Sequence, residues 1–221
     1  MKLSRETLDM LKFASLINRN LEIRPGSVIS TINAANNVIA DLKVPDEFGI
    51  TFGIYDLVEF LGAYSLMGDS VEVEFGTQSA KLSDGKSTIR YHAAGEGTLH
   101  VPTKKIKFPE SDINFSLTAS QLASIVKTSS VLRAPDVVIR GDGKKIDIVV
   151  CEFKNTSTNN YTLENVGETD KEFSAVIRVE NLKLASGLDY TIDISSKKIM
   201  RWVSTDETVT VYNALEATST F

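Results

Sequence analysis

The sequence predicts an α+β fold made of two tandem copies of one unit, each in the order helix, strands, helix, strands. A helical stretch at Leu3–Ile17 recurs at Leu117–Arg133, about 115 residues further along the chain. A short strand pattern, Ser87–Tyr91, is matched by Thr208–Tyr212, and each follows an acidic turn. The length of 221 residues suits two domains of about 110 residues each.

Both repeated stretches have the spacing of amphipathic helices. Apolar or small residues recur at i, i+3, i+4 and i+7, which lines one face of a helix. The buried faces are expected at Thr7, Met10, Leu11, Ala14 and Ile17, and at Leu122, Ile125, Val126, Ser129 and Leu132.

The opposite faces of these helices are basic. Arg5, Lys12 and Arg19 are spaced by sevens and so form one stripe, and Lys127 occupies the same place in the second copy. Any solvated helix face can carry Lys and Arg, but the repeated placement favours a function.

The rest of the first half reads as short strands around a second helix. Asp56 is expected to be the N-cap of a mostly apolar helix, Leu57–Leu66. The turn pair Pro25-Gly26 and the residue Pro45 are expected to end strands. The predicted strands are Leu21–Arg24, Ser27–Ile32, Val38–Val44, Phe48–Ile54, Val71–Phe75, Ser79–Ser83 and Ser87–His92.

A connector is predicted between the two halves. Residues 93–112 have neither a helical nor a strand period and contain several Gly and Pro residues with a cluster of lysines. About 20 such residues are unusual inside a domain and normal between domains. The predicted organisation is a first domain at 1–92, a connector at 93–112 and a second domain at 113–221.

The second half repeats the order of the first. Gly141-Asp142-Gly143 is expected to form a hairpin turn, and Glu180–Ala185 a short helix. The predicted strands are Ile113–Leu117, Val137–Arg140, Lys145–Val150, Tyr161–Val166, Phe173–Val179, Asp189–Ile194, Lys198–Val203 and Thr208–Tyr212.

Composition indicates a soluble globular protein of a reducing compartment. The chain is 42% hydrophobic and 24% charged, with no apolar run of membrane length and no signal peptide. Cys151 is the only cysteine, which excludes an intrachain disulfide. The net charge of −5 argues against nucleic acid, but residues 1–20 and 116–135 are both net positive, so positive charge is concentrated on the repeated helices.

Catalytic motifs are missing from the sequence. His92 and His100 are the only histidines, and no Cys, Asp or Glu lies at metal-ligand spacing with them. There is no nucleophile elbow and no phosphate-binding loop. We therefore expect a binding or scaffold role, without catalytic residues, metal or cofactor.

Several short motifs, spread over the whole chain, resemble those of the DNA sliding clamps. These polymerase processivity factors include proliferating cell nuclear antigen, and the local match is closer to the clamps of T-even-like tailed bacteriophages. The matching pieces are Met1-Lys2-Leu3-Ser4, Ile54-Tyr55-Asp56-Leu57, Phe60-Leu61-Gly62, Ser65-Leu66, Ser87-Thr88-Ile89, Ala93-Ala94, Ile106-Lys107-Phe108-Pro109 and Ala214-Leu215-Glu216-Ala217-Thr218-Ser219-Thr220.

The resemblance implies two tandem copies of the DNA-clamp fold per chain and a ring of three chains. Helices would line a central hole for duplex DNA, and sheets would lie outside. Sequence-independent contacts to phosphates would come from Arg5, Lys12, Arg19, Lys127 and Lys183. The helix Leu57–Leu66 departs from this pattern, because it carries Glu59 and no basic residue.

The resemblance also implies a partner groove, a subunit interface and a set of partners. A C-terminal peptide of the DNA polymerase would dock on Ile32, Val38, Ile106, Phe108, Tyr212, Ala214 and Leu215. Subunits would join through Thr88, Ile89, Arg90 and Tyr91 of one chain and Tyr161, Thr162 and Leu163 of the next. A separate ATP-driven clamp loader would open the ring, in the cytoplasm of the infected bacterial host, with no membrane contact.

Two other classes of protein stay open from the residues alone. A duplicated β-rich virion or tail structural protein would explain the repeat and the missing catalytic motifs, but not the basic helix faces. An enzyme whose carboxylates resemble ordinary surface charge is a weaker alternative.

Overall fold

The computed structural model describes residues 1–68, 70–95, 97–155 and 157–221. The chain divides into two compact units, Met1–Lys105 and Ile106–Phe221. The border falls inside the predicted connector, whose limits at residues 93 and 112 stay predictions.

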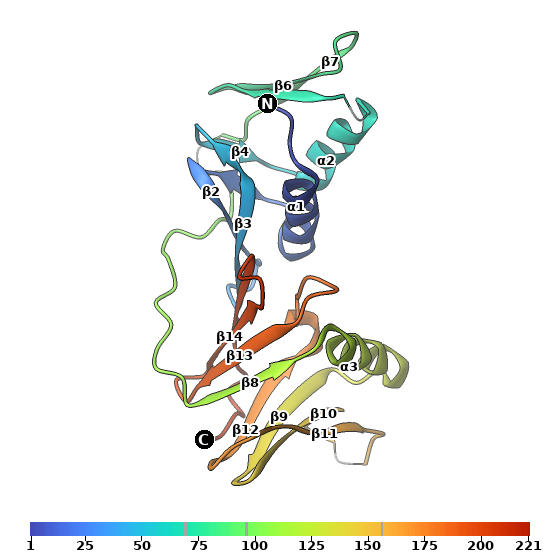
Figure 1. The fold of residues 1–221 in the computed structure, drawn as a ribbon, viewed down its shortest axis with the longest axis vertical. Helices are drawn as coiled ribbons and strands as arrows, with labels where there is room; N and C mark the ends of the chain where they lie inside the picture. Colours follow the sequence, from blue (N-terminus) through green and yellow to red (C-terminus); the bar gives the residue numbers. More distant parts are fainter. Residues whose placement is uncertain (69, 96, 156) are drawn as a thin grey trace. The chain divides into compact units, whose positions relative to one another are not determined.

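The first unit combines two helices with short antiparallel strands (Figure 1). Within the unit, β2 pairs with β3, β1 pairs with β4, and a three-stranded sheet has the order β5-β6-β7. The elements are α1 (Arg5–Ile17), β1 (Leu21–Ile23), β2 (Gly26–Ile32), β3 (Val38–Phe48), β4 (Phe52–Ile54), α2 (Leu57–Leu66), β5 (Glu72–Phe75), β6 (Ser79–Ser83) and β7 (Thr88–His92).

Helix α1 begins where its first free backbone donors find a side-chain acceptor. The Ser4 hydroxyl accepts a hydrogen bond from the Thr7 backbone N–H at 3.2 Å. Asp46 of β3 in turn accepts from the backbone N–H and the hydroxyl of Ser4, at 2.7 and 2.8 Å. Burial raises the pKa of Asp46, but the hydrogen bonds from Thr7 and Ser4 outweigh it, so the pKa is lowered. The cap therefore fixes α1 against β3.

An aromatic cluster forms part of the core of the first unit. The ring of Phe75 lies 5.8 Å from Phe48, 5.2 Å from Phe52 and 6.2 Å from Phe60, which belongs to α2. Contacts between aromatic rings stabilise beyond the apolar area that they bury. The cluster joins β3, β4, β5 and α2 in one core.

Two strand predictions in the first unit are wrong. Strand β3 runs through Pro45 to Phe48, because its pairing with β2 shifts register between Gly26 and Val28 and leaves the exposed proline unpaired there. Consequently Phe48 ends β3, and only Phe52–Ile54 of the predicted strand forms β4. The second helix and its Asp56 cap are confirmed, since the Asp56 carboxylate accepts from the backbone of Val58 and Glu59.

The second unit contains two four-stranded antiparallel arrays and one long helix. One sheet has the order β11-β10-β9-β12, and the other strands follow the order β8-β13-β14-β15. The elements are β8 (Ile113–Leu117), α3 (Ala119–Leu132), β9 (Asp136–Asp142), β10 (Lys145–Cys151), β11 (Tyr161–Glu168), β12 (Glu172–Arg178), the 3-10 turn η1 (Val179–Asn181), β13 (Tyr190–Ser195), β14 (Ile199–Ser204) and β15 (Val209–Ala214).

Helix α3 begins with a capping box. The Thr118 hydroxyl accepts from the Gln121 backbone at 3.3 Å, and the Gln121 side chain accepts from the Thr118 backbone at 2.9 Å. The predicted apolar face is correct for Leu122, Ile125 and Ser129, which are buried. It is wrong for Val126, which is 45% exposed.

The predicted helix Glu180–Ala185 is wrong, because the chain forms only the single 3-10 turn η1 there. After this turn the Lys183 N–H donates to the Asn181 carbonyl, and Leu182 has φ −78 and ψ 69. This is an inverse γ-turn, which cannot continue a helix. The Asn213 amide also donates to the Asn181 carbonyl at 2.6 Å and holds the turn against β15.

The two ends of the chain each cover one edge of a sheet. Backbone groups of Met1 and Val73 exchange hydrogen bonds at 2.7 Å beside β5. Near the other end, Ser174 of β12 pairs with Thr220. In the part of the chain that the structure describes, β7 and β11 therefore remain as the uncovered edge strands of these two sheets.

We expect Gly141→Ala to destabilise the second unit. A Cβ at Gly141 would lie 2.5 Å from the Phe173 ring and 2.7 Å from the Lys171 carbonyl oxygen. Overpacking of this kind costs about 1–3 kcal/mol. Denaturant unfolding measures the loss, with Gly62→Ala of α2 as the matched control, since a Cβ there meets nothing within 4 Å. Equal stability of the two variants would contradict the prediction.

Candidate functional site

The basic face of α1 is exposed as the sequence predicts. Arg5 and Lys12 are both exposed, whereas Leu11 and Ala14 of the apolar face are buried. The Lys12 ammonium lies 2.9 Å from the Asp9 carboxylate, with both side chains more than half exposed. An exposed ion pair of this kind contributes little to stability, so Lys12 can leave Asp9 and bind another anion.

Arg19 is not part of the α1 stripe. The helix ends at Ile17, and Asn18 is extended, so the spacing by sevens does not continue to Arg19. Arg19 instead forms an ion pair at 3.0 Å with Asp56, the N-cap of α2. Burial raises the pKa of Asp56, but hydrogen bonds from the Glu59 and Val58 backbone and the charge of Arg19 lower it overall.

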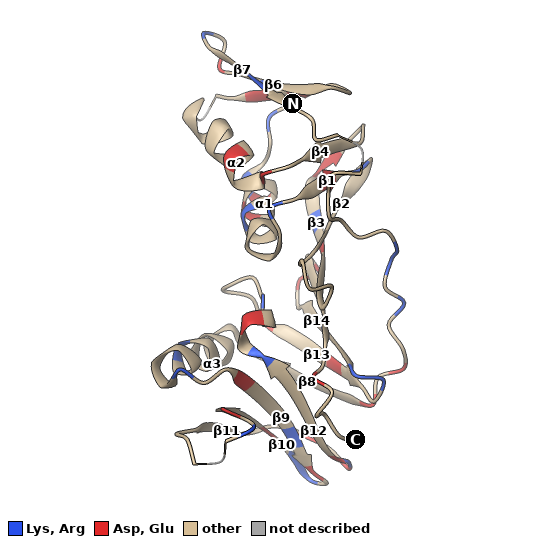
Figure 2. Cartoon of the chain, turned by 180° about the vertical axis from the view of Figure 1, so that it is seen from behind, with Lys and Arg blue, Asp and Glu red and all other residues tan. Residues whose placement is uncertain are grey.

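The second copy of the basic face is reduced to one residue. Lys127 is exposed and is the only charged residue of α3. Lys183 is half-buried and follows η1, so it is not on a helix. Figure 2 shows acidic and no basic colouring on α2, as the sequence requires. The candidate phosphate contacts are therefore sparse.

An aromatic site lies where the connector meets the second unit. The guanidinium carbon of Arg201 lies 4.6 Å from the centre of the Phe108 ring, and the Tyr212 ring lies 6.4 Å from Phe108. Asp193 holds Arg201 in place through two hydrogen bonds of 3.0 and 2.6 Å. Burial raises the pKa of Asp193, but the hydrogen bonds and charge of Arg201 and the hydrogen bond from Asn114 lower it overall.

The remaining groove candidates differ in exposure. Ala214 is exposed and Ile106 is half-buried, whereas Leu215 is buried. In the first unit Ile32 is buried, and Val38 is fully buried and so presents no surface. Sequence reasoning missed Arg201, although Asp193 and Arg201 lie directly opposite each other across the β13–β14 hairpin. Opposite charges at paired positions of a hairpin could have indicated it.

The connector is basic in the sequence just before Phe108. Lys104, Lys105 and Lys107 are all exposed, and Figure 2 shows basic colouring along this segment. The first part of the connector is hydrogen-bonded to the first unit, since Arg24 donates to the Pro102 carbonyl at 3.0 Å and Asn18 to the His100 carbonyl at 2.9 Å. The lysines therefore follow an anchored segment.

The predicted interface residues lie on the two uncovered edge strands. Ile89 and Tyr91 are half-buried and alternate with exposed Thr88 and Arg90 along β7. Tyr161, Thr162 and Leu163 are half-buried at the start of β11. An edge strand presents unpaired N–H and C=O groups that another strand can bind.

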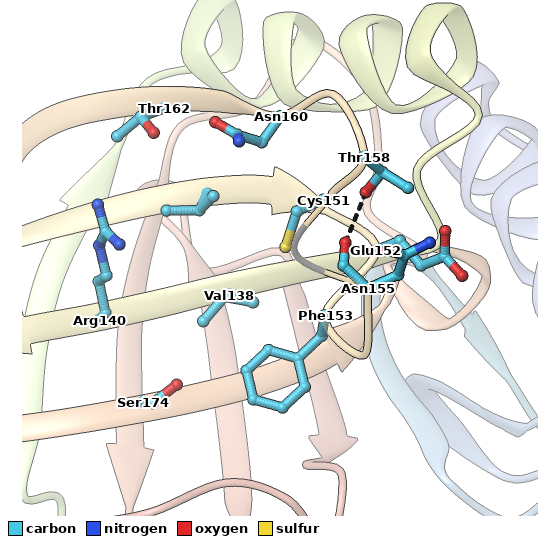
Figure 3. A pocket seen from close by; sticks show the side chains of 11 residues that line it. Val138, Arg140, Cys151, Glu152, Phe153, Asn155, Thr158, Asn160, Thr162 and Ser174 are labelled. Atoms are coloured by element: carbon cyan, nitrogen blue, oxygen red, sulfur yellow. Dashed lines mark hydrogen bonds between the residues drawn. The ribbon is translucent and has the colours of Figure 1, made fainter.

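A pocket of about 330 Å³ opens on the second unit beside β11 (Figure 3). Val138, Val149 and the half-buried Cys151 and Phe153 form its apolar side, with Arg140 and Thr162 among its polar residues. Burial and the nearby Asp136 charge raise the pKa of the Cys151 thiol, which disfavours the thiolate form.

The described residues contain no group of three or more His, Cys, Asp or Glu side chains placed to hold a metal ion. Among them, no helix has both the length and the apolar composition of a membrane span.

Comparison with known proteins identifies the family. No protein-family model matches the chain. The chain is 30% identical to the sliding clamp of Enterobacteria phage T4 over 196 residues, which cover 85% of this chain and 84% of that protein. It is 29% identical to the sliding clamp of Vibrio phage KVP40 over 210 residues, covering 92% and 94% of the two chains. The chain belongs to the phage sliding-clamp family.

Solved structures show the same fold. PCNA from A. fulgidus, in a structure with the C-terminal region of FEN-1, superposes with a TM-score of 0.72 at 15% identity, covering 99% of this chain and 98% of that chain. PCNA from Thermococcus kodakaraensis gives 0.69 at 14% identity, covering 96% of each chain. The predicted α+β clamp fold is confirmed, and these relatives do not favour a virion structural protein.

The hydrogen bonds of Asp112, at the end of the connector, are expected to stabilise the protein less in acid. Asp112 accepts hydrogen bonds from the Ser196 backbone at 2.8 Å and from Lys171 at 2.9 Å, and these lower its pKa from 3.8 to about 2. Because the folded pKa is depressed, this stabilisation is complete above pH 4 and is lost as the pH falls towards 2. Wild type should therefore be more stable than Asp112→Asn above pH 4.

Denaturant unfolding from pH 7 to pH 2 measures this effect. The difference in free energy of unfolding between the two proteins should stay constant down to about pH 4 and then shrink. Ser111→Ala, next to Asp112, controls for changes in the connector that are unrelated to this charge. A difference that does not change with pH would contradict the prediction.

Proposed function

We propose that three copies of this chain form a ring that slides on duplex DNA and tethers the replicative DNA polymerase. The observation that carries the proposal is membership of the phage sliding-clamp family over most of the chain. The protein acts in the cytoplasm of the infected bacterial host. It catalyses no reaction and needs no cofactor or metal, since a tether works through binding alone.

In the proposed ring the exposed faces of α1 and α3 are directed to the DNA. Lys12 and Lys127 provide the principal phosphate contacts, with Arg5, Arg19 and Lys183 as further candidates. Each of these is a contact to the phosphate backbone, which fixes no base sequence. The sparse charge suits a sliding tether, because a densely basic surface would hold DNA too tightly to move along it.

We propose the surface around Phe108 as the docking site for the C-terminal peptide of the polymerase. An aromatic side chain of the peptide would pack on Phe108 and Tyr212, where Arg201 offers a cation beside the rings. Lys104, Lys105 and Lys107 favour a peptide with acidic residues next to that anchor. A separate ATP-driven clamp loader opens the ring, so the clamp itself binds no nucleotide.

We expect Lys12→Glu combined with Lys127→Glu to weaken retention on DNA by at least about tenfold, because each ring loses six phosphate contacts. The measurements are primer extension in the presence of polymerase and loader, and the salt dependence of retention on circular DNA. Retention should also depend less steeply on salt, since fewer counterions are released.

The matched control is Lys144→Glu combined with Lys197→Glu, which makes the same change in net charge at exposed turn residues. If the Lys12 and Lys127 variant supports processive synthesis as well as this control does, the two helices are not part of the DNA-binding surface.

We expect Phe108→Ala to weaken binding of the polymerase peptide by about tenfold or more, because a buried aromatic contact is a typical hot spot of an interface. Calorimetry with a synthetic peptide of the C-terminal residues of the phage polymerase measures the affinity. Phe221→Ala is the matched control, since it truncates a partly exposed phenylalanine that stacks on Phe173 instead. Equal affinities for the two variants would place the groove elsewhere.

A further inference from the structure

The segment that follows α1 holds the connector through two asparagine side chains. Asn18 comes directly after the helix and is extended, with φ −151° and ψ 142°. Its amide nitrogen donates to the His100 carbonyl at 2.9 Å, and the His100 backbone N–H donates to the side-chain oxygen of Asn20 at 3.1 Å. Both backbone groups of one connector residue are thus bound by side chains from the end of α1.

The two side chains act on the connector as a neighbouring β-strand would. In an antiparallel ladder, a residue donates from its N–H and accepts at its carbonyl from the same partner. Here Asn18 supplies the donor and Asn20 the acceptor. The two are also joined to each other, since the Asn20 backbone N–H donates to the Asn18 side-chain oxygen at 2.9 Å. We call Asn18 and Asn20 the asparagine bracket.

Each asparagine also binds a second element of the first unit. The Asn18 amide donates to the Ile32 carbonyl of β2 at 2.8 Å, and the Asn20 amide donates to the Tyr55 carbonyl, just before α2, at 2.7 Å. All of these partners are backbone groups, so they define which end of each side chain is nitrogen and which is oxygen. The end of α1, β2, the start of α2 and the connector therefore meet at the asparagine bracket.

The asparagine bracket has a fixed base. The Asn18 backbone N–H donates to the Ala14 carbonyl at 3.0 Å and so closes the last turn of α1. Between the two asparagines, the Arg19 carbonyl accepts from the Leu57 N–H at 2.8 Å, and its guanidinium pairs with Asp56. Side chains supported in this way hold their partners in a defined position.

The connector is held at two further points beyond the asparagine bracket. Arg24 donates to the Pro102 carbonyl at 3.0 Å, and the ring of Phe108 lies 4.6 Å from the guanidinium carbon of Arg201. The exposed lysines lie between these two points, in residues 103–107. A short segment between fixed points has fewer conformations than a free loop, so less order has to be imposed on it when a partner binds.

We propose that the asparagine bracket positions the connector for peptide recognition, by holding it so that Lys104, Lys105 and Lys107 are presented to an acidic peptide. The inference rests on the proposed function and assigns Asn18 and Asn20 as positioning residues of the same docking site. They do not touch the peptide. They act by ordering the connector beforehand, so that the peptide does not have to order it.

Two substitutions of the same shape and charge test the proposal. Asn20→Asp keeps an oxygen that accepts from the His100 N–H, and its charge strengthens this bond. Asn18→Asp replaces the nitrogen that donates to the His100 carbonyl with an oxygen, which cannot donate. Asn20→Ala removes the acceptor. We therefore expect Asn20→Asp to keep the connector in place, and Asn18→Asp and Asn20→Ala to release it. Asn20→Asp and Asn20→Ala both lose the bond to Tyr55, so their difference isolates the bond to His100.

The first measurement is amide hydrogen exchange, which needs no partner. The His100 amide should exchange about tenfold faster in Asn20→Ala and in Asn18→Asp than in wild type, and within about threefold of wild type in Asn20→Asp. The Thr98 amide is the internal reference, because it donates to the Gly95 carbonyl at 3.2 Å and not to the asparagine bracket.

The second measurement is calorimetry with the synthetic C-terminal peptide of the phage polymerase. Asn18→Asp and Asn20→Ala should bind it about fivefold more weakly than wild type, because the peptide must then order the connector itself. Asn20→Asp should bind within about twofold of wild type, although it carries the same added charge as Asn18→Asp. Asn159→Ala, at an exposed asparagine of the second unit, is the matched control and should bind as wild type does.

The opposite outcomes overturn the inference. If His100 exchanges equally in all variants, or if Asn20→Asp behaves as Asn20→Ala does, the asparagines do not hold the connector. If exchange changes as expected while all variants bind the peptide equally, they hold the connector but do not position it for the peptide. A wild type that binds no peptide contradicts the proposed docking site itself, and the exchange of His100 distinguishes this result from a failed bracket.

Discussion

The unpaired edge strands are the constraint on which the rest of the molecule depends. An open sheet leaves a row of backbone donors and acceptors without partners, which invites uncontrolled pairing. This chain covers one edge of two of its sheets with its own ends: Met1 pairs with Val73 beside β5, and Thr220 with Ser174 of β12. In the part of the chain that the structure describes, the edges of these two sheets that stay open are β7 and β11, whose backbone groups are free to pair with another strand.

Local capping interactions fix where the three helices begin, and so they also fix the positions of the few basic residues on these helices. Ser4 with Asp46 fixes the start of α1, Asp56 fixes α2, and Thr118 with Gln121 fixes α3. Each cap satisfies backbone donors that a helix start leaves free. A lysine on such a helix has a defined direction although its own side chain is mobile. The Arg19–Asp56 pair illustrates a competing demand, since one basic residue near the proposed DNA-facing surface also serves the cap of α2.

Charge is distributed so that an acidic protein can still face an anionic partner. The net charge of −5 opposes nonspecific adhesion to nucleic acid. Exposed positive charge is nevertheless present on α1, at Lys127 of α3 and along the connector. On the connector it adjoins the aromatic site of Phe108, Tyr212 and Arg201, where the Asp193 carboxylate fixes the guanidinium over the ring. The DNA and the polymerase are thus proposed to meet different basic surfaces of one chain.

The sequence by itself determined the fold class, the three helices α1, α2 and α3 and the Asp56 cap of α2, because these follow from periodicity and from local hydrogen bonding. It also placed Lys12 and Lys127 on exposed helix faces. The tertiary structure decided the features that depend on contacts between residues far apart in the sequence. The shift of register with β2 carries β3 through Pro45, and Asn213 holds the turn at Asn181 where a helix was expected. Burial of Val38, the Arg201–Phe108 contact and the covering of two sheet edges by the chain ends likewise need long-range contacts, which no local pattern of residues encodes.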